Sequence, residues 1–370
     1  MKITITKEQF QNGLLVIQNA VGARSSLPIL SNVLLDAEGN KLGLTGSDLD
    51  LTISCSVAAV VETSGKTTLP AKRLQSIVRE LPLQDLTVEA DDEGRCRIEC
   101  GSVKYNLYGL PAADYPQLRT IKEDKKIVLD QGKLKGMLKK TGFAASQEEG
   151  RYVLNGTYLE FKEHKIVVVA TDGRRLALVE EDYDIPENAM GGIIIPVKGV
   201  NELNRLLNEK GTVEINSLEN FVKFKLNNEE GAPVEIFTKL IEGAFPNYRQ
   251  VVPTESKYRI DIYREEFLGA LRRAELVTSE RQNSVKLSFS ENQLTITTNT
   301  PDVGDFLETI AVRFSGEDFS IAFNPAYLIE PLSVLTEDVI FFELTDHMSP
   351  GVVKVNGPFL YVVMPMRLQE

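Results

Sequence analysis

The chain has 370 residues, enough for two or three domains of ordinary size, and a formal net charge of −12 at pH 7. Its hydrophobic content of 42% supports packed cores and argues against a disordered protein. With no tryptophan and only two histidines, the sequence excludes a His-rich metal site and leaves few candidates for acid–base catalysis near neutral pH.

Six helices with one apolar face are predicted in chain order from apolar residues at helical spacing. They begin near Lys7, Lys72, Lys133, Lys198, Arg264 and Pro325. The successive spacings are 65, 61, 65, 66 and 61 residues. This regularity indicates an internal repeat.

Strands surround each predicted helix in the same way. One short strand precedes each helix, at residues 2–5, 66–69, 127–129, 192–195, 258–262 and 319–322. Three alternating runs follow each helix, for example 211–215, 221–226 and 233–238. Hairpin turns are predicted at Glu38-Gly39-Asn40 and Glu291-Asn292. The chain is therefore predicted to contain six β-α-β-β-β repeats.

The repeats form pairs, because residues 113–116 resemble residues 243–246 and both segments end a pair. This predicts three similar α+β domains at 1–120, 121–250 and 251–370, linked through 116–126 and 246–257. Each domain would place two helices on one side of an antiparallel sheet with free edges. Domains joined edge to edge would form half of a ring, helices inside and sheets outside, which a second copy closes.

The cysteines and the apolar runs indicate the cellular compartment of the protein. Three cysteines form no disulfide framework and favour a reducing environment. Cys96 and Cys100 lie in one strand-like run, roughly 13 Å apart, whereas a disulfide requires less than about 7 Å. The first residues resemble no signal peptide, and runs such as 166–170 are too short to span a membrane. We therefore expect a cytoplasmic protein without a membrane partner.

Charge is unevenly distributed along the chain. The six predicted helices together carry +6, so the remaining residues carry −18. Basic residues are common on any solvated helix face, but their concentration in so acidic a chain favours a lining that attracts a polyanion. No aromatic residues interleave with the basic ones, so we expect phosphate contacts without sequence readout.

Several segments together resemble a known family. They are LPILSN at 27–32, LPAADYP at 110–116, RYVLNG at 151–156, ATDGRRL at 170–176, FPNYR at 245–249 and YVVMPMRL at 361–368. Over the whole chain they resemble the bacterial DNA sliding clamps, the beta subunits of the replicative DNA polymerase III holoenzyme. The resemblance implies a homodimeric ring that encircles duplex DNA and slides on it. It also implies a processivity factor that needs no cofactor and is placed on DNA by a separate, ATP-using clamp loader.

The resemblance further implies a pocket that docks short linear peptides of DNA polymerase subunits, the clamp loader and repair factors. The matching residues are Arg151, Leu154, Thr171, Gly173, Arg174, Arg175, Leu176, Pro246, Val251, Met348, Val362, Val363, Met364, Pro365, Met366 and Arg367. Leu, Val and Met suit an adaptable apolar hollow. Arg174 stands where many members have His, and Gln250 where some have Arg. Gln369 and Glu370 follow the usual terminal Arg-Leu.

Two further sets of residues follow from the resemblance and from helix charge. For DNA, the family pattern matches Arg24, Arg73 and Lys198, and helix charge adds Lys72, Arg79, Lys133, Lys139, Lys140 and Arg205. For the dimer interface, the family pattern matches Lys104, Tyr105 and Leu107 of the first domain and Leu276, Val277, Asp302 and Asp305 of the third. The interface would have an apolar centre flanked by opposite charges.

Two other interpretations compete with a clamp. An enzyme would need a catalytic group, and the sequence contains no nucleotide-binding loop or nucleophile elbow. His164 and His347, the latter beside Asp346, lie in predicted turns or loops, and either could in principle form a catalytic dyad. The stronger rival is a scaffold that binds peptides without encircling DNA.

Overall fold

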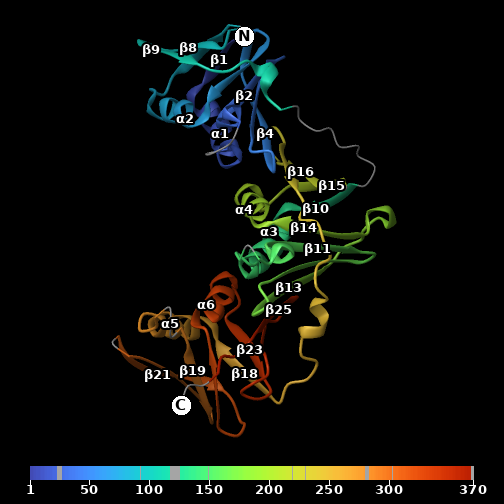
Figure 1. The fold of residues 1–370 in the computed structure, drawn as a ribbon, viewed down its shortest axis with the longest axis vertical. Helices are drawn as coiled ribbons and strands as arrows, with labels where there is room; N and C mark the ends of the chain where they lie inside the picture. The colour runs from blue at the N-terminus through green and yellow to red at the C-terminus, as the bar shows by residue number, and fades with distance from the viewer. Residues whose placement is uncertain are drawn as a thin grey trace. The chain divides into compact units, whose positions relative to one another are not determined.

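The computed structural model describes residues 1–22, 27–91, 93–116, 126–148, 150–218, 220–229, 231–279, 283–301 and 303–367 (Figure 1). The chain divides into two compact units. Unit 1 comprises Met1–Lys135 and Asn201–Leu240, and unit 2 comprises Gly136–Val200 and Ile241–Glu370. The predicted middle domain, residues 121–250, is therefore shared between the two units.

The described residues contain the six predicted α-helices. They are α1 (Lys7–Ile17), α2 (Ala71–Glu80), α3 (Gln131–Thr141), α4 (Val197–Leu206), α5 (Arg264–Glu275) and α6 (Pro325–Val334). The Thr6 side chain accepts a hydrogen bond from the Gln9 amide at the start of α1, and Asn324 caps α6. Leu74 and Val78 of α2 are fully buried, so an apolar stripe fixes this helix against its sheet.

The strands confirm the predicted repeat. The first two repeats contain β1 (Lys2–Thr6), β2 (Asn32–Glu38), β3 (Lys41–Ser47), β4 (Leu51–Ala58), β5 (Val60–Thr63), β6 (Gly65–Pro70), β7 (Asp85–Ala90), β8 (Arg95–Cys100) and β9 (Val103–Tyr108). The next two contain β10 (Lys126–Asp130), β11 (Gly156–Lys162), β12 (Lys165–Thr171), β13 (Arg175–Asp182), β14 (Gly191–Pro196), β15 (Thr212–Leu218), β16 (Phe221–Asn227) and β17 (Val234–Lys239). The last two contain β18 (Tyr258–Tyr263), β19 (Val285–Ser290), β20 (Gln293–Thr300), β21 (Gly304–Arg313), β22 (Phe319–Phe323), β23 (Val339–Leu344), β24 (Gly351–Lys354) and β25 (Phe359–Val363).

One strand departs from the pattern of four per repeat. The run after β3 breaks at Ala59 into β4, which pairs with β3, and β5, which pairs with β1. In the fifth repeat the single strand β21 does both, pairing with β20 and, at its end, with β18. The sequence did not predict this break.

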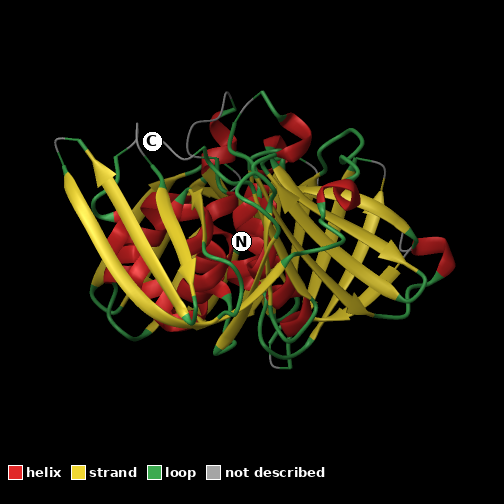
Figure 2. Ribbon diagram, turned by 90° about the horizontal axis from the view of Figure 1, so that it is seen from below, coloured by secondary structure: helices red, strands yellow, loops and turns green. Residues whose placement is uncertain are grey.

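The strands form antiparallel sheets. Unit 1 contains a five-stranded sheet, β5-β1-β7-β8-β9, and an eight-stranded sheet, β10-β15-β16-β17-β4-β3-β2-β6. Unit 2 contains a twelve-stranded sheet, β14-β11-β12-β13-β25-β24-β23-β18-β21-β20-β19-β22. Within each unit the helices pack on one face of the sheets (Figure 2). For example, α1 packs on β4 and α5 on β20.

Two strand pairs join parts of the sheets that come from different predicted domains. In the first junction, β4 pairs with β17, with Ile53 opposite Ile236. In the second junction, β13 pairs with β25, with Ala177 opposite Tyr361. Both junctions lie within one compact unit each. Sheets therefore run on across domain boundaries, as edge-to-edge joining predicts.

Several local predictions are confirmed. The β2–β3 and β19–β20 hairpins turn at Gly39 and Asn292, which have φ of 62° and 56°. Cys96 and Cys100 are free, buried thiols on β8, as their strand spacing predicts. No helix within the described ranges is long and apolar enough to cross a membrane.

The linker expectation needs correction. The segment 246–257 is not a plain linker, because Tyr248–Val251 form a short 3-10 helix and Tyr248 is buried on the sheet. The last strand, β25, lies between β13 and β24, where it makes the second junction.

Candidate functional site

The loop between β12 and β13 is a tight turn, as residues 171–173 predict. Asp172 Oδ1 accepts hydrogen bonds from the amides of Arg174 and Arg175, at 2.8 and 3.0 Å. The Thr171 hydroxyl accepts the Gly173 amide at 3.1 Å. Gly173 has φ +84°, a conformation that disfavours side chains. The turn thus fixes the start of β13.

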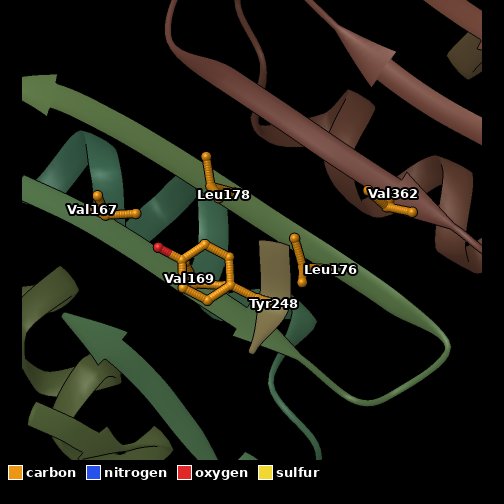
Figure 3. Packing of buried hydrophobic residues seen from close by; sticks show 6 residues of the cluster. All are labelled: Val167, Val169, Leu176, Leu178, Tyr248 and Val362. Carbon is orange, nitrogen blue, oxygen red and sulfur yellow. The ribbon is translucent and has the colours of Figure 1, made fainter. Parts of the chain in front are cut away.

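Leu176 and Val362, both predicted pocket residues, lie directly opposite each other across the second junction. They belong to an apolar cluster with Val167, Val169, Leu178 and Tyr248 (Figure 3). Phe245, Val252 and Leu360 pack against it while partly buried. This is the floor of the candidate site, and we call these residues the apolar floor. Sequence reasoning missed Leu178 and Tyr248, although Leu178 follows Leu176 at the two-residue spacing of one strand face.

Arg175 is not on the face that Leu176 presents, because consecutive strand residues point to opposite faces. Its side chain is 9% exposed and forms ion pairs with Asp172 at 3.1 Å and with Glu330 of α6. Its guanidinium also lies 4.5 Å from the centre of the Tyr327 ring. Val363, directly opposite Arg175, is likewise fully buried. These two predicted pocket residues therefore support the site from behind rather than line it.

Three exposed methionines belong to the predicted pocket set, two after β25 and one in the β23–β24 loop. Met348, Met364 and Met366 are 72%, 45% and 39% exposed. The Met364 amide donates to the Arg174 carbonyl at 2.9 Å, which ties the end of β25 to the turn before β13. Val251, Pro246, Pro365 and Arg367 are exposed or half-buried, and Leu154 is half-buried. Tyr152, 58% exposed beside Leu154, was missed by sequence reasoning.

Charged residues beside the apolar floor form a group of ion pairs, which we call the polar rim. Glu148 lies 3.3 Å from Arg151 and 3.7 Å from Arg174. Arg151 also donates to the Asp172 carbonyl. A hydrogen bond with Tyr327, reinforced by nearby Glu148, raises the pKa of Arg174. Arg174 thus carries a positive charge at the rim.

The predicted DNA-contacting cations differ in what they touch. Lys72, Arg73 and Lys139 are exposed, and none of them has a carboxylate within 4 Å among the described residues. Lys133 and Lys198 are exposed as well. Arg24 lies outside the described residues. Arg79 pairs with its neighbour Glu80 at 3.0 Å.

Two of these cations have structural roles. The Arg205 guanidinium donates to the carbonyls of Leu15 and Val16 at the end of α1, at 3.0 and 2.6 Å, and pairs with buried Glu202. Cations at a helix C-terminus are favoured by the exposed carbonyls there. Lys140 pairs with Glu337 at 3.2 Å, with both side chains about three-quarters buried. The charge of each is therefore already paired with a carboxylate within the chain.

The predicted interface residues lie on or near β9, which ends its sheet, and β21, which pairs with β18 only at its last residues. Tyr105 is 37% exposed on β9, and Leu107 is buried. Leu276, after α5, is 81% exposed, and Asp305 is exposed on β21. Asp302 lies outside the described residues. Leu307 on β21, 70% exposed, was not predicted.

Comparison with known proteins places this architecture in a family. Three family models match consecutive parts of the chain: the N-terminal domain of the DNA polymerase III beta subunit at 1–119, its central domain at 128–247 and its C-terminal domain at 249–367. The chain belongs to the bacterial DNA polymerase III beta sliding clamp family. Members of this family are non-catalytic processivity factors.

Named relatives match from end to end. The chain is 36% identical over 379 residues to a beta sliding clamp from Caulobacter vibrioides and 33% identical over 370 residues to one from Chlamydia muridarum, with full coverage of both chains. Among solved structures, it is similar to the DnaN sliding clamp from Bartonella birtlesii bound to griselimycin, at 35% identity, full coverage of both chains and a TM-score of 0.94. A Bacillus subtilis clamp structure matches with a TM-score of 0.93 and 30% identity.

The two histidines lie where turns were predicted. His164 is in the β11–β12 hairpin, with Nδ1 3.2 Å from exposed Asp184. Asp346, beside His347, accepts hydrogen bonds from the amides of Met348 and Ser349, which lower the pKa of its carboxyl. This carboxylate shapes a loop, in agreement with membership of a non-catalytic clamp family.

Proposed function

We propose that two copies of this chain close head to tail into a ring that encircles duplex DNA, slides along it and tethers DNA polymerases and repair factors. One observation carries the proposal. Each junction pairs the strand that follows the first hairpin of a domain's first repeat (β4, β13) with the last strand of the next domain's second repeat (β17, β25). The equivalent strands β21 of the third domain and β9 of the first have no such partner from another domain among the described residues.

The two remaining strands have free edges in the described residues. β9 is the end of its sheet. Residues 304–311 of β21 pair with β20 on one side, and only 312–313 reach β18 on the other. Unpaired edges are a liability unless something pairs with or covers them. A second copy would supply the missing partner at both ends, and a head-to-tail contact that closes gives a ring.

The repeat also predicts the register of this contact. Tyr105, Ile236 and Tyr361 hold the same position in their repeats. Each pairs with the equivalent residue of the strand that precedes it in the chain. Phe306 likewise occupies the place of Ile53 and Ala177. Since Ile236 pairs with Ile53 and Tyr361 with Ala177, Tyr105 of one copy should lie opposite Phe306 of the other. Exposed Leu307 and the end of α5 at Leu276 would add apolar area.

The DNA-facing surface is proposed to be the helix faces. Lys72, Arg73 and Lys139 are the best placed to meet phosphates, because they are exposed and carry no ion pair among the residues described. Contacts to phosphate carry no sequence information. A closed ring needs only weak contacts, because it leaves the DNA only by opening or at a free end.

The apolar floor and its methionine-bearing rim are proposed to dock short linear peptides of polymerase subunits, a clamp loader and repair factors. Flexible Met side chains adapt to several partners. The structure of the Bartonella birtlesii clamp bound to griselimycin supports a ligand site in this family. The clamp function itself requires no cofactor, and we expect the protein in the cytoplasm.

A cysteine pair tests the ring against the scaffold that binds peptides without encircling DNA. Asn106 and Asp305 share the predicted register, and both are exposed. Paired antiparallel residues lie about 5 Å apart, within reach of a disulfide. Oxidised Asn106→Cys/Asp305→Cys should therefore migrate as a closed covalent dimer on a denaturing gel without reductant. Burial raises the pKa of Cys55 and Cys96 to about 12, so these native thiols should not interfere.

The matched control is Asn106→Cys/Thr309→Cys, since Thr309 is exposed on the same strand. Four residues shift the second cysteine by roughly 13 Å, beyond the reach of a disulfide. Cross-linking in the first variant alone supports the ring. A chain that stays monomeric by light scattering, with no cross-link in either variant, would favour the scaffold.

A further inference from the structure

Helices as well as strands meet across the first junction. The Arg205 guanidinium of α4 donates to the carbonyls of Leu15 and Val16 in the last turn of α1, at 3.0 and 2.6 Å. Asn19, just after α1, donates to Glu202 of α4 at 2.8 Å. The helix of one domain's first repeat is thus joined to the helix of the next domain's second repeat, as β4 is joined to β17.

The second junction joins the equivalent helices. Lys140, in the last turn of α3, pairs at 3.2 Å with Glu337, which follows α6. Helix α3 belongs to the first repeat of the second domain, and α6 belongs to the second repeat of the third. By the same rule, a closing contact that pairs β21 with β9 of a second copy brings α5 of one copy beside α2 of the other.

Arg79 holds in α2 the position that Arg205 holds in α4. Both helices have ten residues, each follows directly on a proline (Pro70 and Pro196), and the arginine is the ninth residue of each. The Arg79 side chain is 67% exposed, and its carboxylate partner in the described part of the chain is the adjacent, exposed Glu80. Such a surface ion pair contributes little, so the guanidinium can serve another acceptor.

The acceptors correspond as well. Helix α1 buries its fourth, seventh, eighth and eleventh residues, and α5 buries the same four together with its fifth. The carbonyls that match those of Leu15 and Val16 are therefore those of Arg272 and Arg273. The side chains of these two arginines are already bound, Arg272 to the Ser333 hydroxyl and Arg273 to both carboxylate oxygens of Glu308. This reduces their repulsion of a third arginine.

We propose that Arg79 of one copy donates to the carbonyls of Arg272 and Arg273 at the end of α5 in the second copy. The inference rests on the proposed ring and adds to it a contact beyond the strand edges. Carbonyls at a helix C-terminus favour a cation, and Leu276, next to them, is 81% exposed. Arg79, which helix charge alone groups with the DNA-contacting residues, thus belongs to the ring-closing contact.

The first measurement is the dissociation constant of the dimer, from sedimentation over a dilution series without DNA. Arg79→Ala should raise it about tenfold, which corresponds to ~1.4 kcal/mol. The matched control, Lys286→Ala, removes an exposed cation from β19, two strands away from β21, and should leave the constant unchanged.

The second measurement separates a ring-closing role from a DNA contact. It uses the oxidised Asn106→Cys/Asp305→Cys dimer on short linear duplexes, because this dimer cannot dissociate. Adding Arg79→Ala should leave the slope of log affinity against log salt unchanged, whereas adding Lys139→Ala should reduce the slope.

The outcomes distinguish this inference from the ring itself. An unchanged dimer dissociation constant for Arg79→Ala, or a reduced salt slope, would overturn the inference while the cysteine pair still cross-links. A wild-type chain that stays monomeric, with no cross-link in the cysteine variant, would overturn the proposed ring and this inference with it.

Discussion

The two junctions have the same backbone pairing, but their side chains differ on the outer face of the sheet, which is the face away from the helices. In the second junction Leu176 faces Val362 and Leu178 faces Leu360. The repeat places Thr52 opposite Phe237 and Ser54 opposite Glu235 at the corresponding positions of the first junction. Main-chain pairing therefore joins domains at both places, whereas the apolar floor exists at only one.

The surroundings of the outer face are also polar at the first junction and apolar at the second. The first junction borders a cavity of about 750 Å³ with charged and hydroxyl lining, which includes the Asp36–Lys66 ion pair at 2.8 Å. The Tyr115 hydroxyl donates to the Thr45 carbonyl over this face. In the second junction Tyr248 packs on leucines and valines. Joining of the domains therefore depends on backbone pairing, whereas the proposed peptide docking depends on the side chains of the outer face.

The largest expected effect comes from giving the second junction the side chains of the first. Leu176→Thr/Leu178→Ser should lower the affinity for docking peptides by roughly 100-fold, because the apolar floor is lost. The free energy of unfolding should fall by about 2–4 kcal/mol. Fluorescence anisotropy and urea denaturation measure the two effects.

The converse substitution is the matched control for that change. Thr52→Leu/Ser54→Leu adds leucines to the first junction, which has no methionine rim, and should leave the affinity for the same peptide unchanged. If the second-junction variant retained full peptide affinity, docking would not depend on the apolar floor.

The next largest effect is expected on stability, from a change of Arg175 behind the apolar floor. Leu51, buried, occupies in the first junction the place of Arg175 in the second. Arg175→Leu should cost about 3 kcal/mol of stability, because Glu330 and Asp172 lose their buried partner. Arg175→Leu/Glu330→Leu should recover most of that loss, since the first junction carries the apolar Leu51 at this position. Chemical denaturation of both variants checks this, and an equal loss in the double variant would contradict it.

The smallest effect is on DNA. Lys72→Glu/Lys139→Glu should leave peptide affinity and stability unchanged and should weaken electrostatic DNA binding. Each lost phosphate contact should reduce the slope of log affinity against log salt by about 0.9. Lys140 is unsuitable for this comparison, because its ion pair with Glu337 would be broken as well. An unchanged salt slope would remove these helix faces from the DNA-contacting surface.

The repeat made much of the fold predictable. Regular spacing and alternation give all six helices and the order of strands, because both depend on local apolar periodicity. The break at Ala59 and the division of the middle domain between two units depend on long-range pairing, which no local pattern reports. The position of β25 between two domains has the same cause.

The candidate site was predictable in part. Leu176 and Val362 were found through the resemblance, and Leu178 could have been found by alternation along β13. Tyr248 could not, because its burial results from a short 3-10 helix that folds back on the sheet. The roles of Arg175 and Arg205 depend on partners such as Glu330 and the α1 carbonyls, which are distant in sequence.

The central claim is topological, and the cysteine pair allows it to be measured directly. The Asn106→Cys/Asp305→Cys chain would be placed on nicked circular DNA by a clamp loader, oxidised and washed at about 1 M salt, where the screening length is about 3 Å. We expect the covalent dimer to stay on the intact circle and to leave once the circle is cut at one site. Equal loss from circular and linear DNA would contradict encirclement and leave a peptide-binding scaffold.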